Sequence, residues 1–294
     1  MTWRCTGIRW CGGRPAVGWT ADGRGERTSP LVYGAPLAFA ARGERRCLGV
    51  RRAGKRTPCP AGAAVPAAAG NAQCPECARL DRSFSVAADT NAGDPRPYRV
   101  YLAWFGPGLA KVGITAEERG AARLLEQGAV AWAWLGRGPL MAGRRTEELL
   151  RAALGVPDRI PYARKRAVRS RLPAAADRAG AVAALHAEAA ALEGWPQSLE
   201  RLPCEVVDHA AVFGLDGLDG MDGPARTVTA MASGGAVAGR LAAAAGPDLH
   251  FSDGLVLDTR LLAGWELVAA AGRTTDVPVA ALPSEGGARQ DGLF

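Results

Sequence analysis

The stretch YRVYLAWFGPGLAKVGITAEERGAARLLEQGA, residues 98–129, decides the fold of the central part of the chain. Its first eight residues alternate between two sets of side chains with the period of a β-strand, GPG forms a turn, and LAKVGIT predicts a second strand. Together they predict a β-hairpin. Thr115 and Glu118 form the T-x-x-E pattern of a capping box, so we expect a helix to begin there and to end at Gly128.

The pattern continues downstream of this helix. AVAWAWLG (129–136) predicts a third strand, and GRRTEELLRAALG predicts a second helix that ends at Gly155 before Pro157. A long Ala-rich helix is expected at about 174–193. This order of elements predicts an α+β fold, with a small antiparallel three-stranded sheet flanked by helices.

Composition divides the chain into four parts. Residues 1–94 hold six of the seven cysteines among many Gly and Pro, and we interpret them as a Cys-rich, zinc-binding β region. Residues 95–198 form the α+β domain with the Ala-rich helix. Residues 199–273 return to short apolar runs and predict a small β-rich C-terminal domain, and residues 274–294 have the composition of a disordered tail.

Charge and hydropathy limit the classes of function. The chain of 294 residues has a formal net charge of +7, which suits a polyanionic partner but equally fits an Arg-rich, GC-biased coding sequence. It shows no signal-peptide pattern and no run of roughly 18 apolar residues, so we expect a cytoplasmic protein without a membrane partner. In that compartment cysteines are metal ligands or free thiols before they are disulfides.

Four cysteines predict a structural zinc site: Cys47, Cys59, Cys74 and Cys77. The last two form CPEC, a CxxC whose two thiolates can bind one tetrahedral metal ion, and a closed four-thiolate site is structural rather than catalytic. A redox CxxC is the main alternative, but no strand-to-helix thioredoxin pattern surrounds it. Cys5 and Cys11 are either replacements for Cys47 or Cys59 as ligands, or buried thiols.

The combination of VYL, GLAKVGIT and R-LLEQGA resembles the core of the GIY-YIG endonuclease superfamily over about residues 98–170. Two of its relatives are more similar still. One is a set of phage-type proteins, and the other is an uncharacterised bacterial family of unknown function with a Cys-rich N-terminus. The resemblance implies a nucleic-acid partner, DNA or RNA, and hydrolysis of its phosphodiester bonds.

In that superfamily a tyrosine positions or deprotonates the attacking water, a helix arginine binds the scissile phosphate, and a glutamate holds one divalent metal ion. Carried over to this chain, the resemblance implies Tyr101 as the tyrosine and Arg123 as the arginine, with Arg119 assisting one turn earlier. Lys111 stands in the second motif, KVG, where the superfamily usually has a tyrosine. It is a second phosphate-binding candidate.

Helical periodicity selects the glutamate. Glu147 shares a face with Leu150 and Leu154, whereas Glu148 lies on a charged side near Arg151. A carboxylate on an inward face needs a metal or a partner, so Glu147 is the predicted ligand of Mg²⁺ or Mn²⁺. If the helix is rotated from this arrangement, both carboxylates are solvated.

The run DRIPYARKRAVRSRLP predicts a surface that follows a phosphate backbone, with a charged linker as the alternative. Its predicted nucleic-acid contacts are Arg164, Lys165, Arg166 and Arg169.

The motifs also depart from the superfamily pattern. Arg99 stands where a glycine is usual, Lys111 replaces a tyrosine, and no asparagine follows Asn91. Three functions therefore stay open. They are a metal-dependent endonuclease, a catalytically degenerate nucleic-acid-binding module, and a zinc-containing protein–protein adaptor.

Overall fold

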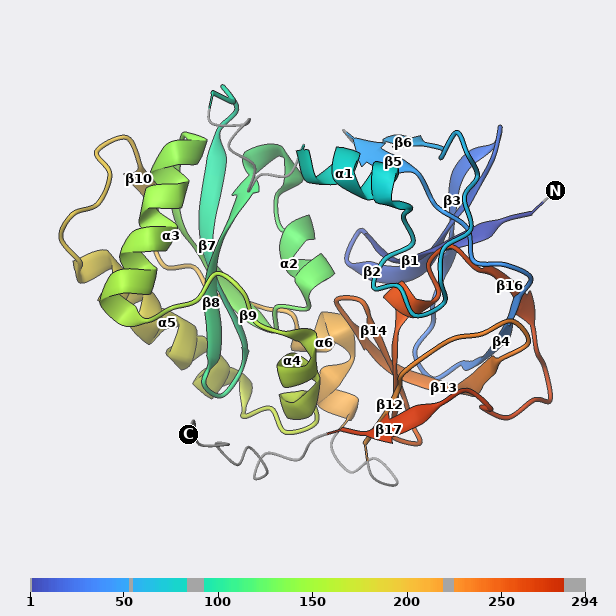
Figure 1. The fold of residues 1–294 in the computed structure, drawn as a ribbon. Coiled ribbons are helices and arrows are strands. Elements are labelled where there is room, and N and C mark those ends of the chain that lie inside the picture. The colour runs from blue at the N-terminus through green and yellow to red at the C-terminus, as the bar shows by residue number, and fades with distance from the viewer. Residues whose placement is uncertain (1, 53–54, 84–92, 219–224, 283–294) are drawn as a thin grey trace, which may run out of the picture.

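The computed structural model of the protein describes residues 2–52, 55–83, 93–218 and 225–282. Figure 1 shows two parts: a sheet with helices on it, built from the middle of the chain, and a β-rich part built from both ends. The predicted α+β class is confirmed. The sheets are larger than the three strands expected, because segments distant in the sequence extend each of them.

The central sheet has five strands. The predicted hairpin forms as β7 (Tyr98–Gly106) and β8 (Leu109–Ala116), which pair antiparallel. The predicted third strand is β9 (Ala131–Gly138), on the other side of β7. Two short strands then pair with β9, namely β10 (Glu200–Arg201) and β11 (Val207–Asp208). The chain after the long helix thus returns along β9 and widens the sheet.

Four helices accompany this sheet: α2 (Ala122–Gln127), α3 (Leu140–Leu154), α4 (Tyr162–Val168) and α5 (Ala175–Ala191). The strand period sorts the side chains of β7 between them. Val100 and Leu102 pack in one apolar cluster with residues of α3 and α5. Tyr101 and Ala103 pack in another with residues of α2 and α4. Tyr101 therefore faces the side of the sheet that α2 and α4 cover.

The predicted capping box does not form. Thr115 is buried within β8, whose pairing with β7 continues to Ala116. A single 3₁₀ turn at Glu117–Arg119 follows, and α2 begins only at Ala122. Strand pairing with β7 thus overrides the local helix-start signal. The predicted helix end is confirmed, since Gly128 takes the left-handed conformation with φ 69°.

The two β regions expected at opposite ends of the chain share one ten-stranded sheet. In spatial order its strands are β17 (Val279–Ala281), β12 (Arg226–Val228), β15 (Leu255–Asp258), β14 (Asp248–Phe251), β13 (Ala236–Ala245), β4 (Pro36–Arg42), β16 (Glu266–Ala269), β1 (Arg4–Cys11), β2 (Arg14–Ala21) and β3 (Gly25–Pro30). The N-terminal β4 pairs with two C-terminal strands, β13 and β16. Blue and red strands accordingly lie side by side in Figure 1.

The expected C-terminal tail begins inside this sheet, because β17 pairs with β12. The rest of that tail, residues 283–294, lies outside the described residues.

The smaller elements complete the chain: β5 (Val50–Arg52), β6 (Lys55–Thr57), α1 (Pro75–Ser83), α6 (Ala210–Phe213), and 3₁₀ turns η3 (Leu215–Gly217) and η4 (Thr259–Leu261). β5 and β6 form a separate two-stranded hairpin next to α1. In the described part of the chain, no helix has both the length and the apolar character that crossing a membrane requires.

Candidate functional site

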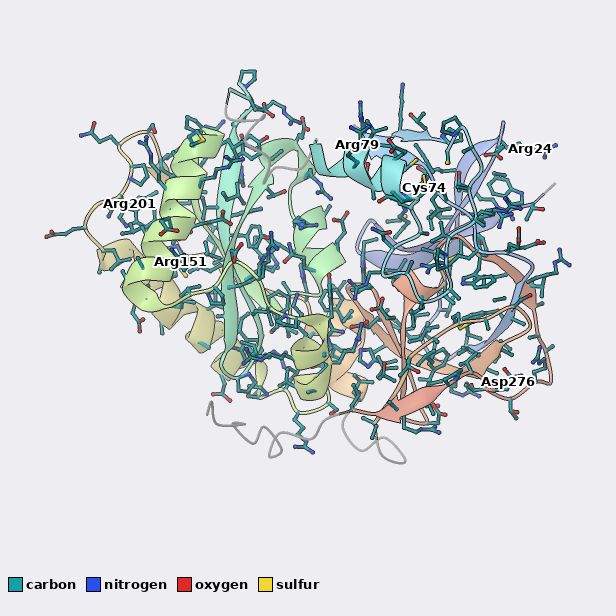
Figure 2. The ribbon with its side chains drawn as sticks, viewed as in Figure 1. Arg24, Cys74, Arg79, Arg151, Arg201 and Asp276 are labelled. Carbon is teal, nitrogen blue, oxygen red and sulfur yellow. The ribbon has the colours of Figure 1, made fainter. Side chains whose placement is uncertain are left out.

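The four predicted cysteines meet at one point beside α1, and we call them the thiol cluster: Cys47, Cys59, Cys74 and Cys77. Their Sγ atoms all lie within 4.8 Å of one another. Three separate segments supply them, and Figure 2 shows Cys74 next to α1, in the part of the molecule with β5 and β6. A set of four thiols this close can bind one metal ion, as the sequence predicted.

Close backbone contact brings the loops of the thiol cluster together. At Gly49, with φ 72°, an added Cβ would lie 2.0 Å from the carbonyl oxygen of Thr57. Only glycine therefore lets the chain after Cys47 pass so close to the segment before Cys59. The backbone N–H of Cys74 also donates a hydrogen bond to Cys47 Sγ at 3.2 Å, which ties the third segment to the first.

Sequence reasoning missed Arg45, which holds the loop around the thiol cluster. Its side chain is buried and donates to backbone carbonyls, among them those of Ala69 at 2.8 Å and Ala263 at 2.9 Å. Burial lowers the pKa of this guanidinium. The sequence signal was its place among the basic residues that surround Cys47.

The thiols of the cluster differ in acidity. Hydrogen bonds from backbone N–H groups, that of Ala63 foremost, lower the pKa of Cys59 to about 7. Burial raises the pKa of both Cys47 and Cys77. The two alternative cysteines lie outside the cluster: Cys5 is fully buried, which raises its pKa to about 12, and Cys11 is exposed.

The structure also brings together the four residues selected by resemblance, which we call the tyrosine group: Tyr101, Lys111, Arg123 and Glu147. Strand register pairs Ala103 with Lys111, so Lys111 shares a face with Tyr101 and its Nζ lies 5.7 Å from the centre of the tyrosine ring. The charges of Arg123 and Glu147 act on the pKa values of both. Four separate elements, β7, β8, α2 and α3, thus converge. The catalytic roles stay predictions.

Close packing explains why the KVG motif has a glycine at position 113. Gly113 is the register partner of Tyr101, and a Cβ added to it would lie 2.3 Å from the tyrosine hydroxyl. The ring therefore crosses directly over Gly113. A second contact fixes the hydroxyl, since Gln127 Nε2 donates to it at 2.8 Å.

Gln127 is a site residue that sequence reasoning did not select. It belongs to the quoted motif LLEQGA and lies one turn after Arg123, which was the available signal. Its backbone carbonyl accepts a hydrogen bond from Lys165 Nζ at 3.2 Å. Lys165, Gln127 and Tyr101 therefore form a buried chain of contacts.

Burial shifts the pKa values of Glu147 and Lys111 in the direction that favours their neutral forms. It raises the pKa of Glu147 to about 7, against the opposing attraction of Lys111, and Asp158 raises it further. Burial, with repulsion from Arg123, lowers the pKa of Lys111 to about 8, and its Nζ donates to the carbonyl oxygen of Asp158 at 2.7 Å. The pKa of Tyr101 is raised, mainly by burial.

Access to the group is uneven. Tyr101 is 1% exposed and Lys111 is 8% exposed. The side chain of Arg123 is 45% exposed and lies 3.8 Å from Glu126, which also pairs with Arg119 at 2.7 Å. A ligand arriving from solvent would therefore meet Arg123 first.

The basic run 158–171 is exposed only in part, since Arg159, Arg164 and Arg171 are exposed whereas Lys165 and Arg169 are buried. It forms α4, which docks on the ten-stranded sheet. Arg166 and Arg169 pair with Asp248, which is 0% exposed, and Arg166 also pairs with Asp258. These carboxylates lie about 80 residues and more downstream, so no local pattern revealed the pairs. Arg166 and Arg169 join the two parts of the molecule instead of facing outward.

Lys165 is likewise 3% exposed, with its Nζ 3.7 Å from the centre of the Phe105 ring. Burial lowers the pKa of this ammonium to about 7. Of the five predicted nucleic-acid contacts, Arg119 and Arg164 are exposed in the structure.

Comparison with known proteins identifies a family for this chain but no curated protein or solved structure that is similar to it. The model of a family described as "Protein of unknown function (DUF2797)" matches residues 34–267. No curated protein and no solved structure matches the chain. The matched range contains the whole thiol cluster and the whole tyrosine group.

Proposed function

The chain belongs to the DUF2797 family, and we propose that it is a zinc-containing, GIY-YIG-like nucleic-acid-binding protein that hydrolyses phosphodiester bonds with one divalent cation. The observation that carries this proposal is the convergence of the tyrosine group. A resemblance in short motifs selected three of its residues and helical periodicity selected the fourth. The charges of Arg123 and Glu147 act on the pKa values of Tyr101 and Lys111, although the four residues come from four different elements.

Each side chain suits a step of phosphodiester hydrolysis. Arg123, the exposed member, would bind the scissile phosphate, and Lys111 would add positive charge where the oxyanion develops. Gln127 donates to the Tyr101 hydroxyl, which leaves the phenolic proton free to bind an oxygen of substrate or water. With a raised pKa, Tyr101 suits a positioning donor better than a general base.

The residues present fit a hard divalent cation. Mg²⁺ keeps several waters and is commonly held by one or two carboxylates together with substrate phosphate oxygens, so Glu147 with a bound phosphodiester would supply a sufficient donor set for Mg²⁺ or Mn²⁺. The bound cation would neutralise charge on the phosphate oxygens. Glu147 is only partly buried, and its charge acts on the pKa of Lys111.

The thiol cluster fits zinc and a structural role. Four thiol ligands leave no open position for a reacting water, so this metal would hold the loops and take no part in hydrolysis. The proposal therefore assigns two metals to two separate sites with different donor chemistry.

A cleavage assay tests the proposal. Zinc-loaded protein is mixed with labelled single-stranded, duplex and branched DNA and RNA, with Mg²⁺, with Mn²⁺ or with EDTA. We expect cation-dependent cleavage that Arg123→Ala slows about 100-fold or more. Arg151→Ala is the matched control, because it removes an exposed arginine that pairs with Glu148 outside the tyrosine group. Equal cleavage by both variants would rule out the assigned role of Arg123.

One observation favours a second function, nucleic-acid binding without turnover. Tyr101 is 1% exposed, so its hydroxyl reaches a substrate only if the surrounding side chains move. In that case the same assay would show no cleavage with any substrate, while binding would still weaken in Arg123→Ala and not in Arg151→Ala.

A further inference from the structure

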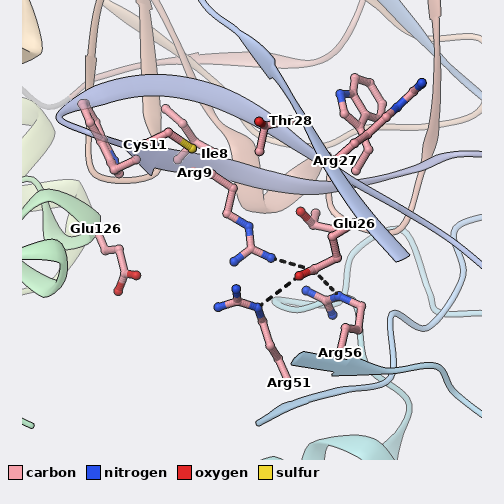
Figure 3. Close-up of a pocket in the computed structure, with 12 residues that line it drawn as sticks. Ile8, Arg9, Cys11, Glu26, Arg27, Thr28, Arg51, Arg56 and Glu126 are labelled. Atoms are coloured by element: carbon pink, nitrogen blue, oxygen red, sulfur yellow. Dashed lines mark hydrogen bonds and ion pairs between the residues drawn. The ribbon is translucent and has the colours of Figure 1, made fainter. Parts of the chain in front are cut away.

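A cleft of about 600 Å³ lies where β1 and β3, the β5–β6 hairpin and α2 approach one another. We call its basic side chains the arginine cleft: Arg9, Arg51 and Arg56. All three point toward one carboxylate, Glu26, as Figure 3 shows. The nitrogen–oxygen distances to Glu26 are 3.0 Å from Arg9, 3.6 Å from Arg51 and 3.0 Å from Arg56.

Positive charge exceeds negative charge in this cleft. Four arginines and two glutamates line it, Arg27 and Glu126 being the remaining charged members. Arg51 and Arg56 are direct register partners in the hairpin, a position where like charges destabilise a strand pair. Burial and then repulsion from Arg51 lower the pKa of Arg9. A bound anion would offset this repulsion.

The cleft is adjacent to the exposed end of the tyrosine group. Glu126 of α2 lines the cleft and lies 3.8 Å from Arg123. A smaller cavity of about 150 Å³ shares Glu126, Ile8 and Trp10 with it and continues to Tyr162 of α4. Glu126 thus lines the arginine cleft and also lies next to Arg123.

We propose that the arginine cleft binds phosphate groups of the same nucleic-acid strand whose scissile phosphate lies at Arg123. The inference rests on the proposed function. Three converging guanidinium groups suit phosphate oxygens, because each presents a planar fork of donors. Trp10 and Trp19 also line the cleft and add aromatic surface beside the cations, a combination found in grooves that follow a nucleic-acid strand.

The test measures binding by fluorescence anisotropy with labelled single-stranded and duplex oligonucleotides over a range of KCl concentrations. In the variant Arg9→Gln with Arg51→Gln we expect about 10-fold weaker binding and a salt slope smaller by about one to two, one contact for each lost charge. Arg56 is left in place because its Nη1 also donates to the carbonyl of Leu48 and supports the hairpin.

Two further variants keep this test decisive. Arg14→Gln with Arg24→Gln removes two exposed arginines outside the cleft and should bind nearly as wild type. Glu26→Gln removes the carboxylate between the arginines, so it should tighten binding and steepen the salt dependence. A misfolded protein would not bind more tightly.

The outcomes separate this inference from the proposed function. If the wild type binds nucleic acid and the Arg9 and Arg51 variant binds equally well, the arginine cleft is not a phosphate site, whereas the proposed function stands. If the wild type binds no oligonucleotide at low salt, both fail. A competition experiment adds polyglutamate at the same concentration of negative charge as the oligonucleotide. If polyglutamate displaces the oligonucleotide from the wild type but not from the Arg9 and Arg51 variant, the cleft selects acidic peptide and the inference is overturned.

Discussion

The thiol cluster and the tyrosine group are both built from distant segments, but they are held in opposite ways. Loops carry three of the thiols and α1 carries Cys77, and the apolar cluster around them has Val50 and Val65 as its buried aliphatic side chains. The tyrosine group projects from a paired hairpin and two helices, on a sheet with buried side chains on both faces.

The two sites therefore differ in what orders their side chains. A site with so small a core would gain its order from a bound ion, and four identical donors at one point indicate metal-binding chemistry with little further context. A site on a packed sheet is ordered before any ligand arrives. Its chemistry depends on access and charge, which are set by the many residues around it.

The largest effect is expected in the thiol cluster. Cys74→Ser with Cys77→Ser should abolish zinc binding and unfold the region around β5, β6 and α1, since zinc contributes about 10 kcal/mol or more to the folding of small zinc domains. Zinc content by atomic absorption and hydrogen exchange measure this. Cys204→Ser is the control, because Cys204 is exposed and outside the cluster. Retained zinc and protection in the double variant would refute the site.

The next effect contrasts two adjacent carboxylates on α3. Glu147→Gln should reduce Mg²⁺-dependent cleavage by about 100-fold or more, because it removes the predicted metal ligand. Glu148→Gln should cleave as wild type, because Glu148 is exposed and pairs with Arg151 at 2.5 Å. Equal loss in both variants, or in neither, would contradict the assignment of Glu147.

A third test asks whether the hairpin needs its glycine. Gly113→Ala places a methyl group against the Tyr101 ring and should destabilise the protein by about 1–3 kcal/mol, measured by urea unfolding. Gly180→Ala in α5 is the matched control, since no atom lies within 4 Å of its added Cβ, and there alanine should stabilise by up to about 1 kcal/mol. A neutral Gly113→Ala would mean that the ring does not cross the strand there.

The smallest effect is the pH dependence of stability. The pKa of Glu147 is raised from 4.5 to about 7 in the folded protein, so its contribution to stability is complete below about pH 4.5 and is lost as the pH rises through about 7. Glu147→Gln should therefore gain stability relative to wild type between pH 5 and 8. Urea unfolding with zinc present and without Mg²⁺ measures the difference, and a constant value across this range would argue against a buried carboxyl.

Local patterns predicted much of the site. The strand alternation of residues 98–105 and the turn after them gave the hairpin, and helical spacing separated Glu147 from Glu148, which the structure shows as partly buried and exposed, respectively. The four cysteines followed from a CxxC and two more thiols. The strand, turn and helix signals are readable in sequence because they depend on residues within a few positions of one another, and the cysteines are readable because of their residue type and the CxxC spacing.

Long-range pairing produced the rest. Thr115 carried a helix-start signal but continued a strand, because β7 supplied a partner along its whole length. The sequence predicted that Arg166 and Arg169 belong to a solvated basic surface, but in the structure both pair with the buried Asp248. In the first case the partner strand of the hairpin, and in the second a distant segment, offered more stabilisation than the local preference.

By itself, then, the sequence determined the α+β class, the hairpin, the four clustered thiols and the choice of Tyr101, Lys111, Arg123 and Glu147. Only the tertiary structure decided that both ends of the chain share one sheet, that α4 is an internal contact, and that Arg9 and Arg51 face the same cleft as Glu126. The reason is physical: periodicity and motif spacing act over one or two turns, whereas burial, charge pairing and strand order depend on which distant segments meet.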